Sequence, residues 1–373
     1  MNKKICCIFN YAPHYRLPIY KKMDSELKCD FYFGDKERSP IKKLDYAQLN
    51  GFIKELKTGP ILNTSFTWQK GVWPILFKKY NYYIITGDPY YLSNWVIILV
   101  GKIFGKKIIP WSHGIKGNSD NKMEWFEELF FKLCPLILLY GNHSRNVMIK
   151  KGFKPDKLVC IYNSLNYEKQ LAVRNKLKST NIYKGHFGNS NPIIIYIGRI
   201  QKSKNLELLV EITKELNDSG KPCNLVFIGK DVGDNDVVKT AEKLNILNKI
   251  WFYGPCYDEE KIGELIYNAN VCVSPGPVGL TALHSLTYGT PIVSNDDFEG
   301  QMPEFEVIVP EKSGGFYIKD NNNDLKKKIT YWLSISQEKR EMTRSYCYKI
   351  IEENWNPKSQ IKALKKIFLN ETY

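Results

Sequence analysis

The sequence predicts an α/β protein with two doubly wound domains, each a parallel sheet covered by helices on both faces. Two observations predict this fold class. Short, nearly all-apolar runs alternate with helical stretches in both halves of the 373 residues, as buried parallel strands do. Between the halves, NKLKSTNIYKGHFGNSNP (175–192) is polar and rich in Gly, Asn, Ser and Lys, which is typical of a linker.

The strands are expected where β-branched or aromatic runs end at turn residues. In the first half these runs are residues 4–10, 28–33, 82–87, 106–112, 136–141 and 157–163. In the second half they are residues 192–198, 224–229, 249–254, 270–274 and 291–294. The expected domain ranges are 1–175, a linker at 176–191, 192–345, and a C-terminal helix at 346–373 that packs toward the first domain.

The composition is that of a soluble globular protein, with 43% hydrophobic and 25% charged residues. The nine cysteines include no Cys-x-x-Cys pair and no cluster with His at metal spacing, so we expect free thiols in a reducing cytoplasm and no metal site. No secretory signal is visible at the start. The longest apolar stretch, 95–105, is too short to span a bilayer.

Positive charge is concentrated in the first half. Residues 1–170 contain 27 Lys and Arg against 14 Asp and Glu, whereas residues 171–373 contain 27 against 25. A solvated basic face, an anionic substrate, an anionic membrane surface and nucleic acid would each fit this asymmetry. No helix-turn-helix, zinc-finger or aromatic RNA-binding signature is present, so we expect no nucleic acid partner.

The first candidate site follows the strand at 192–198. Gly198 permits a tight exit from the strand, and Arg199 and Lys204 stand on the loop before the next helix. An Arg that binds bidentately and a Lys that acts as a point charge suit two adjacent phosphates. On this segment alone, ordinary surface charge fits equally.

The second candidate site is SPGPVGLTALHSLTYGTP, residues 274–291. A helix is expected to start after Gly279 and to end near Gly289. The N–H groups of its first turn, at Leu280 and Thr281, form a potential anion site. His284 shares a face with that turn, although a lone histidine on a helix is commonly a packing residue.

Three further candidates follow strands. Glu304 lies after Pro303 before a strand-like run, and Gly314–Gly315 is expected to turn the chain back. In the first half, Arg16 and His113 fall just after strands, at the carboxyl edge where α/β sheets bind ligands.

Taken together, the ordered segments resemble the family 4 glycosyltransferases, which are retaining enzymes with the two-Rossmann GT-B fold. The resemblance is strongest over residues 192–318. It rests on GRIQKSKN, NLVFIGK, IWFYGPCYDEEKIGELIYNANVCVSP, LTYGTPIVSND and MPEFEVIV, and in the first half on WSHG and KLVCIYNSLN. It implies two Rossmann-like domains that face a cleft.

This sequence departs from the family pattern of two glutamates around the signature helix. Gly276 stands where the first Glu belongs and His284 where the second belongs. In the family, the first usually meets the donor sugar and the second meets the ribose. A histidine can still hydrogen-bond a hydroxyl, but glycine cannot replace a carboxylate. Similar Gly/His variants occur in bacterial polysaccharide glycosyltransferases.

The resemblance implies transfer of a sugar from a nucleoside-diphosphate sugar, UDP rather than GDP, to a glycan acceptor in cell-surface polysaccharide biosynthesis. Arg199 and Lys204 would stabilise the leaving phosphate, with His113 near the sugar and no metal or other cofactor required. The remaining residues that the resemblance assigns to the donor are Gly198, Cys256, Gly276, Val278, Gly279, Leu280, Thr281, His284 and Glu304. On the acceptor side we expect His14, Tyr15 and Arg16.

The acceptor is expected to be linked to a polyprenyl diphosphate at the inner face of the plasma membrane. The basic, aromatic-rich first half fits peripheral docking there. Two alternatives remain open: a nucleotide-sugar 2-epimerase of the same fold, and a non-catalytic nucleotide-sugar-binding protein.

Overall fold

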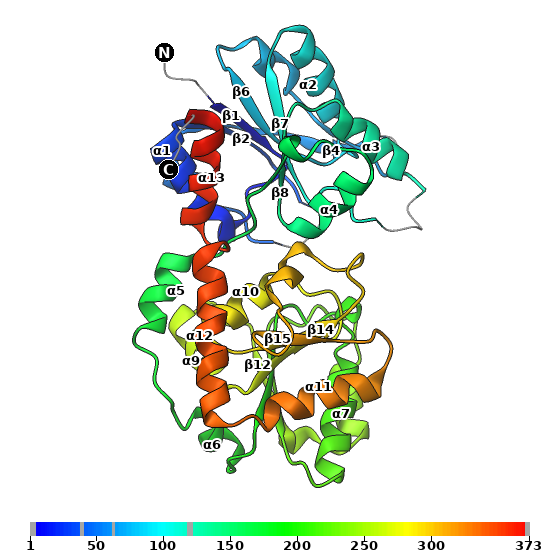
Figure 1. Ribbon diagram of the computed structural model, residues 1–373, viewed down its shortest axis with the longest axis vertical. Coiled ribbons are helices and arrows are strands. Elements are labelled where there is room, and N and C mark those ends of the chain that lie inside the picture. Colours follow the sequence, from blue (N-terminus) through cyan, green and yellow to red (C-terminus); the bar gives the residue numbers. More distant parts are fainter. Residues whose placement is uncertain (1–4, 38–40, 62–63, 118–121, 370–373) are drawn as a thin grey trace. The chain divides into compact units, whose positions relative to one another are not determined.

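A computed structural model describes residues 5–37, 41–61, 64–117 and 122–369. The chain forms two compact units (Figure 1). One contains residues up to Asn166 together with those from Asn354 onward, and the other is Tyr167–Glu353. The units differ from the expected ranges, because the second begins at Tyr167, ahead of the expected linker at 176–191.

The first unit is built on a sheet of seven parallel strands in the order β3-β2-β1-β6-β7-β8-β9. The strands are β1 (Ile5–Phe9), β2 (Cys29–Gly34), β3 (Phe52–Leu56), β6 (Tyr82–Thr86), β7 (Lys107–Ser112), β8 (Ile137–Leu139) and β9 (Leu158–Cys160). The strand order reverses between β1 and β6, which is the type of position where doubly wound sheets bind ligands. A separate antiparallel pair consists of β4 (Thr58–Pro60) and β5 (Thr67–Gln69).

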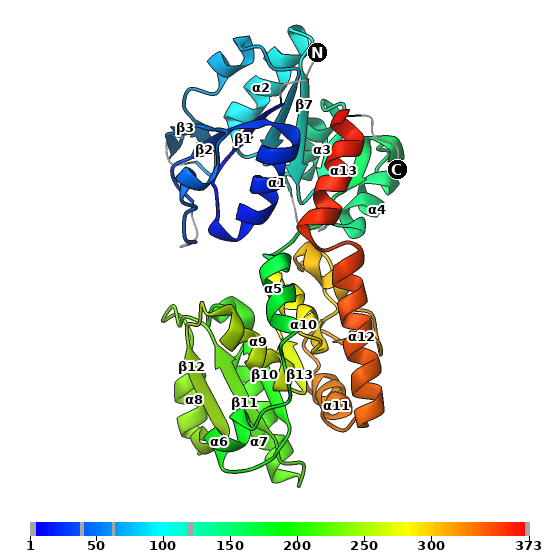
Figure 2. The ribbon, with the colours of Figure 1, turned by 90° about the vertical axis from the view of Figure 1, so that its left-hand side faces the viewer.

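Helices cover both faces of this sheet. They are α1 (Leu17–Leu27), α2 (Leu92–Ile103), α3 (Glu124–Lys132), α4 (Asn142–Lys150) and α13 (Pro357–Leu369). Side chains of β1 alternate between two buried clusters, with Cys7 in one and Cys6 in the other, as the period of a strand requires. Helices α1 and α13 lie side by side (Figures 1 and 2), and Leu364 and Phe368 of α13 are fully buried in the Cys7 cluster.

The second unit contains six parallel strands in the order β12-β11-β10-β13-β14-β15. They are β10 (Ile193–Ile197), β11 (Asn224–Ile228), β12 (Ile250–Gly254), β13 (Val271–Ser274), β14 (Ile292–Asn295) and β15 (Gly314–Tyr317). The helices are α5 (Tyr167–Arg174), α6 (Ile182–Phe187), α7 (Glu207–Asp218), α8 (Val237–Lys243), α9 (Glu259–Asn268), α10 (Leu280–Thr287), α11 (Asn322–Leu333) and α12 (Gln337–Glu353). The predicted fold class, two parallel-sheet α/β domains, is therefore confirmed.

The expected turn at Gly314–Gly315 was wrong, because these glycines begin the edge strand β15. A Cβ atom on Gly314 would lie 1.8 Å from the carbonyl oxygen of Ile292, so only glycine lets this strand approach β14. The strand-like run after Pro303 was also wrong, since Pro303–Val307 forms the short 3-10 helix η7. Strands β3, β4 and β5 were not predicted.

The structure shows helices in both the expected linker and the expected C-terminal helix. Helix α6 lies inside the range 176–191. The C-terminal range 346–373 is divided between α12 in the second unit and α13 in the first; residues 370–373 lie outside the described residues. Over the described parts of the chain, we find no helix with the length and apolar character needed to cross a bilayer.

Candidate functional site

In the second unit, two glycine turns bring the loops after β10 and β11 into contact. Gly198 leaves β10 at a φ of 145°, and Gly229 leaves β11 at 157°. A Cβ atom on Gly229 would lie 1.7 Å from the carbonyl oxygen of Gly198. Glycine is therefore required for this close approach, which shapes the carboxyl edge of the sheet.

Lys204 joins the loop after β10 to the loop after β13. It ends the 3-10 helix η5 (Lys202–Lys204), and its Nζ atom donates a hydrogen bond to the carbonyl oxygen of Pro277. The N–H group of Gly276 donates in turn to the carbonyl oxygen of Lys204, at 3.0 Å. The ammonium group is therefore held beside the start of α10.

Two cations share this edge of the sheet. The Arg199 side chain is exposed, and its carbonyl oxygen accepts from the hydroxyl of Tyr196 at 2.9 Å. Burial lowers the pKa of Lys204, and the nearby Arg199 lowers it further, while Glu304 opposes both effects. An anion bound here would offset the repulsion between the two cations.

A buried polar network fixes the loop between β13 and α10. Gln301 is 2% exposed, and its Oε1 atom accepts from the N–H group of Val278 at 2.6 Å. The Asn295 side chain donates to the carbonyl oxygen of Pro275 at 2.6 Å, and the Tyr317 hydroxyl donates to the same oxygen at 2.9 Å. These bonds hold the carbonyl of Pro275 inward and fix the direction in which α10 begins.

Helix α10 begins at Leu280 with no side-chain cap. The N–H group of Ala282 donates to the carbonyl oxygen of Gly279 at 2.9 Å, whereas those of Leu280 and Thr281 have no partner within the helix, so they and the helix dipole favour an anion. A Cβ atom on Gly279 would have nothing closer than the Met302 side chain at 3.8 Å, which leaves the approach to the helix open. The Thr281 hydroxyl donates to the carbonyl oxygen of Ile197 at 2.6 Å and so ties α10 to β10.

Gly276 lies against the backbone of the neighbouring loop. A Cβ atom there would come within 2.5 Å of the Ser203 carbonyl oxygen and 2.8 Å of the Lys204 Cα atom. A carboxylate side chain cannot occupy this position unless that loop moves. The glycine therefore reflects close packing of two loops.

His284 lies beside a carboxylate from another helix. Its Nε2 atom is 3.6 Å from Oε1 of Glu259, the first residue of α9. Glu304, on η7, is 3% exposed and acts electrostatically on Lys204. These residues all belong to the second unit.

The first unit contains a cavity of about 350 Å³ at the carboxyl ends of β1, β6, β7 and β8. Tyr15, Arg16 and His113 line it, whereas His14 does not. The His14 ring is exposed, and its Nδ1 atom lies 3.3 Å from the carbonyl oxygen of Lys42. The structure therefore separates His14 from the other two residues expected on the acceptor side.

Aromatic rings hold Arg16 in this cavity. Its guanidinium lies 5.1 Å from the ring centre of Trp111 and 5.0 Å from that of Tyr140, and it donates a hydrogen bond to the Tyr140 hydroxyl. The charge is thus fixed by cation–π contacts and one hydrogen bond.

His113 lies 4.7 Å from the Tyr140 ring, and its buried Nδ1 atom has no hydrogen-bond partner among the described residues. Burial lowers the pKa of His113 to about 3, with smaller contributions from Lys116 and Arg16. The ring is therefore neutral near pH 7 and can exchange hydrogen bonds with a neutral ligand.

Comparison with known proteins shows which family these features resemble. Residues 178–350 match the family model described as glycosyl transferases group 1. An uncharacterized glycosyltransferase of Methanocaldococcus jannaschii is 22% identical over 320 residues, which cover 79% of this chain and 78% of that protein.

The solved structures that resemble the chain share its fold. HepE of Anabaena in complex with UDP has a TM-score of 0.72 at 13% identity and covers 99% of this chain and 100% of its own. A glycosyltransferase from Rickettsia africae has a TM-score of 0.75 at 16% identity and covers 100% of both chains. The chain therefore has the GT-B fold, and the findings support a glycosyltransferase.

The second unit contains residues that the sequence alone did not single out. Gln301 and Asn295 fix the loop before α10, and Glu259 lies beside His284. Asn295 ends β14, so its place after a strand is a signal that could have been used. Gln301 and Glu259 carry no such signal, because their roles depend on contacts with other elements.

Cys256 is the least supported of the expected donor residues. It follows β12 at the edge of the sheet, and its Sγ atom contacts the carbonyl oxygen of Asp258 at 3.7 Å. Among the described residues of the second unit, no side-chain hydrogen bond joins it to η5 or α10. In those same residues, no group of three or more His, Cys, Asp or Glu is arranged to hold a metal ion.

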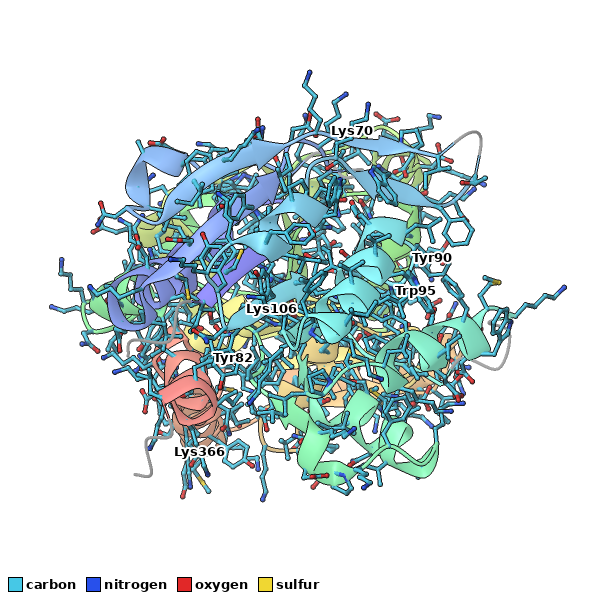
Figure 3. The ribbon with its side chains drawn as sticks, turned by 90° about the horizontal axis from the view of Figure 1, so that it is seen from above. Lys70, Tyr82, Tyr90, Trp95, Lys106 and Lys366 are labelled. Carbon is cyan, nitrogen blue, oxygen red and sulfur yellow. The ribbon has the colours of Figure 1, made fainter. Side chains whose placement is uncertain are left out.

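The cavity of the first unit also contains polar residues that were not predicted. Asn10 follows β1 and donates to Glu37 at 3.3 Å, and the Tyr90 hydroxyl donates to Glu127 at 3.2 Å. Tyr90 and Trp95, both labelled in Figure 3, lie against the ring of Phe126. The cavity thus combines carboxylates with aromatic walls.

Proposed function

We propose that this protein transfers a sugar from a nucleoside-diphosphate sugar, with UDP preferred over GDP, to a hydroxyl group of a glycan acceptor. The observation that carries the proposal is the placement of Lys204 and Arg199 beside the uncapped start of α10. Cleavage of the bond between the anomeric carbon and the diphosphate builds negative charge on the leaving phosphate. Preorganised cations and N–H groups stabilise that charge, and no metal is required in this scheme.

UDP is preferred because HepE of Anabaena, which shares the fold, was solved in complex with UDP and with UDP-glucose. Retention of the anomeric configuration is supported by the family 4 resemblance. In this scheme the acceptor hydroxyl attacks on the face that the leaving group occupies, and the protein forms no covalent intermediate.

The cavity of the first unit is proposed to bind the acceptor. Aromatic faces pack against sugar rings, while carboxylates and amides exchange hydrogen bonds with hydroxyl groups. Trp111, Tyr90, Asn10, Glu37 and Glu127 provide both kinds of contact. A neutral His113 among them can accept a hydrogen bond from a hydroxyl group or donate one to it.

Docking on the cytoplasmic face of an anionic membrane is supported by an exposed apolar surface on the first unit. It consists of Trp73 and Phe77 on η3 (Trp73–Phe77) and of Ile103 and Phe104 at the end of α2, each more than half exposed. The Phe77 ring lies 5.8 Å from Trp73 and 5.3 Å from Phe104. Residues 66–117 contain seven Lys and one Asp, and Figure 3 labels two of those lysines, Lys70 and Lys106.

Donor binding is tested by thermal-shift screening against UDP, GDP and a panel of their sugars, since a ligand that binds only the folded state raises the melting temperature. The best donor is then radiolabelled and incubated with and without lipid-linked glycan acceptors. Product that depends on the acceptor supports the proposal. Conversion of the donor to an epimer without acceptor would favour the 2-epimerase, and binding without turnover would favour a binding protein.

Membrane docking is tested by co-sedimentation with vesicles that contain anionic lipid. Replacing Trp73 and Phe77 with Ser should reduce the bound fraction several-fold, because each change removes apolar area that would enter the interface. Replacing Trp125, which is 63% exposed on α3, is the matched control. Equal binding by both variants would remove the membrane assignment of this surface.

A further inference from the structure

Glu259 has an environment that its position in the sequence does not explain. It is the first residue of α9, but Asp258 already caps that helix by accepting from the N–H group of Glu260 at 2.9 Å. The Glu259 side chain is 15% exposed. Its Oε1 atom accepts from the Tyr288 hydroxyl at 2.7 Å and from the Gln170 amide at 3.1 Å.

Partners from two other elements of the second unit therefore hold this carboxylate. Gln170 comes from α5, and Tyr288 follows α10. Burial raises the pKa of Glu259, but the nearby His284 and the hydrogen bonds from Tyr288 and Gln170 outweigh burial and lower the pKa to about 2. The group is charged near pH 7, and a buried charge is costly unless its partners are well placed.

One ring nitrogen of His284 lies near this carboxylate. Its Nε2 atom lies 3.6 Å from the Oε1 atom of Glu259. His284 and Tyr288 are four residues apart, so they share a face of the helix and approach the same oxygen atom. The bond made by one ring nitrogen determines the role of the other.

The other ring nitrogen of His284, Nδ1, is left available to a ligand. Within the described part of the chain, no protein atom contacts Nδ1 of His284 at hydrogen-bond distance, and the side chain is 22% exposed. Leu280, in the first turn of α10, lies four residues earlier on the same face. A ligand bound at that first turn would therefore come close to the His284 ring.

We propose that Glu259 is a positioning residue for His284, because it binds the Nε2–H group and leaves Nδ1 to accept a hydrogen bond from a hydroxyl of the nucleotide sugar. The inference rests on the proposed function and adds a residue to its donor site. Glu259 itself does not touch the donor. A carboxylate at position 284 would need no partner to accept a hydrogen bond, whereas a histidine does so only through the ring nitrogen that carries no proton. Glu259 determines which nitrogen that is.

Nitrogen-15 NMR of the imidazole side chains tests the inference directly, since the chain contains only five histidines. The His284 signals are assigned by their loss in His284→Ala. In the wild type we expect the proton on Nε2, and on addition of UDP or the best donor sugar the Nδ1 signal should shift as an acceptor does. A wild-type proton on Nδ1 would overturn the proposal without any variant.

Donor affinity supplies the second measurement, with Glu259→Gln compared with Glu260→Gln, an exposed residue of the same helix turn. Glu259→Gln should weaken binding about tenfold, and this loss should vanish in a His284→Ala background because coupled residues are not additive. Equal affinities in Glu259→Gln and Glu260→Gln, or full additivity with His284→Ala, would overturn the proposal.

The two proposals fail in different ways. If the wild type binds no nucleotide but its spectrum shows the Nε2 proton and loses that preference in Glu259→Gln, the proposed function fails while the positioning of His284 stands. If the wild type transfers sugar and Glu259→Gln behaves like Glu260→Gln, only the positioning role fails. Circular dichroism of each variant verifies that it is folded.

Discussion

The carboxyl edges of the two sheets are built in different ways. In the second unit, the edge presents backbone groups and cations that buried amides and a tyrosine hold in place, as Gln301 does for Val278. In the first unit, the edge forms a cavity of side chains, with Arg16 held between aromatic rings and a half-buried His113 beside them. The same topology therefore supports two kinds of surface.

The difference shows what each edge can recognise. Fixed N–H groups and cations suit a diphosphate, whose charge is the same whatever sugar it carries. A cavity of aromatic rings, carboxylates and amides suits hydroxyl groups, and its side chains can change without altering the backbone. In a sugar transferase, the first property fits the donor and the second fits a variable acceptor.

The largest effect is expected from the cations of the second unit. Lys204→Ala and Arg199→Ala should each reduce the rate of transfer by a factor of about 100 or more, because each removes charge stabilisation from the leaving phosphate. Steady-state kinetics with the best donor measures this. Lys202→Ala removes an exposed lysine of the same short helix and is the control. Unchanged rates in both variants would contradict the phosphate assignment.

The next largest effects are expected at two glycines of the loop before α10, where alanine should reduce stability at one position and UDP binding at the other. Gly276→Ala should lower the free energy of unfolding by about 1–3 kcal/mol, because its methyl group would collide with the backbone of Ser203 and Lys204. Gly279→Ala should leave stability nearly unchanged, since the nearest atom is 3.8 Å away. It should instead weaken UDP binding by crowding the start of α10.

Urea unfolding and calorimetry of both glycine variants measure these effects. If Gly276→Ala folds and binds UDP as the wild type does, the loop before α10 is not packed as the structure describes. If Gly279→Ala leaves UDP affinity unchanged, the start of α10 does not approach the donor.

The smallest effect concerns His113 in the first unit. Burial lowers its pKa from 6.5 to about 3, so between these values the folded state binds fewer protons than the unfolded state. The free energy of unfolding therefore falls as pH decreases from 6.5 toward 3, by at most about 1.4 kcal/mol per pH unit. Below pH 3 this contribution no longer changes.

His113→Asn should remove that part of the pH dependence, as urea unfolding at a series of pH values would measure. His14→Asn, which changes an exposed ring outside the cavity, is the control. An unaltered slope in His113→Asn would mean that the ring is not buried as a neutral group, and the contrast between the two sheet edges would weaken.

The sequence by itself determined the two parallel sheets and most of their strands. Apolar runs of a few residues between turn residues report burial on both faces, which is a local property. The same reasoning located Gly198, Lys204 and Gly279, because residues after parallel strands gather at one edge. It could not locate β15, because Gly314 and Gly315 are strand residues only by virtue of the close approach to β14.

The tertiary structure alone decided which distant residues meet. It brought Glu259 to His284, packed Gly276 against Lys204, and placed α13 beside α1 in the first unit. Each of these contacts joins segments that are separated along the chain, and no periodic pattern encodes its partner. The chain specifies such pairs through the summed packing of a whole unit, so they become visible only when that unit is assembled.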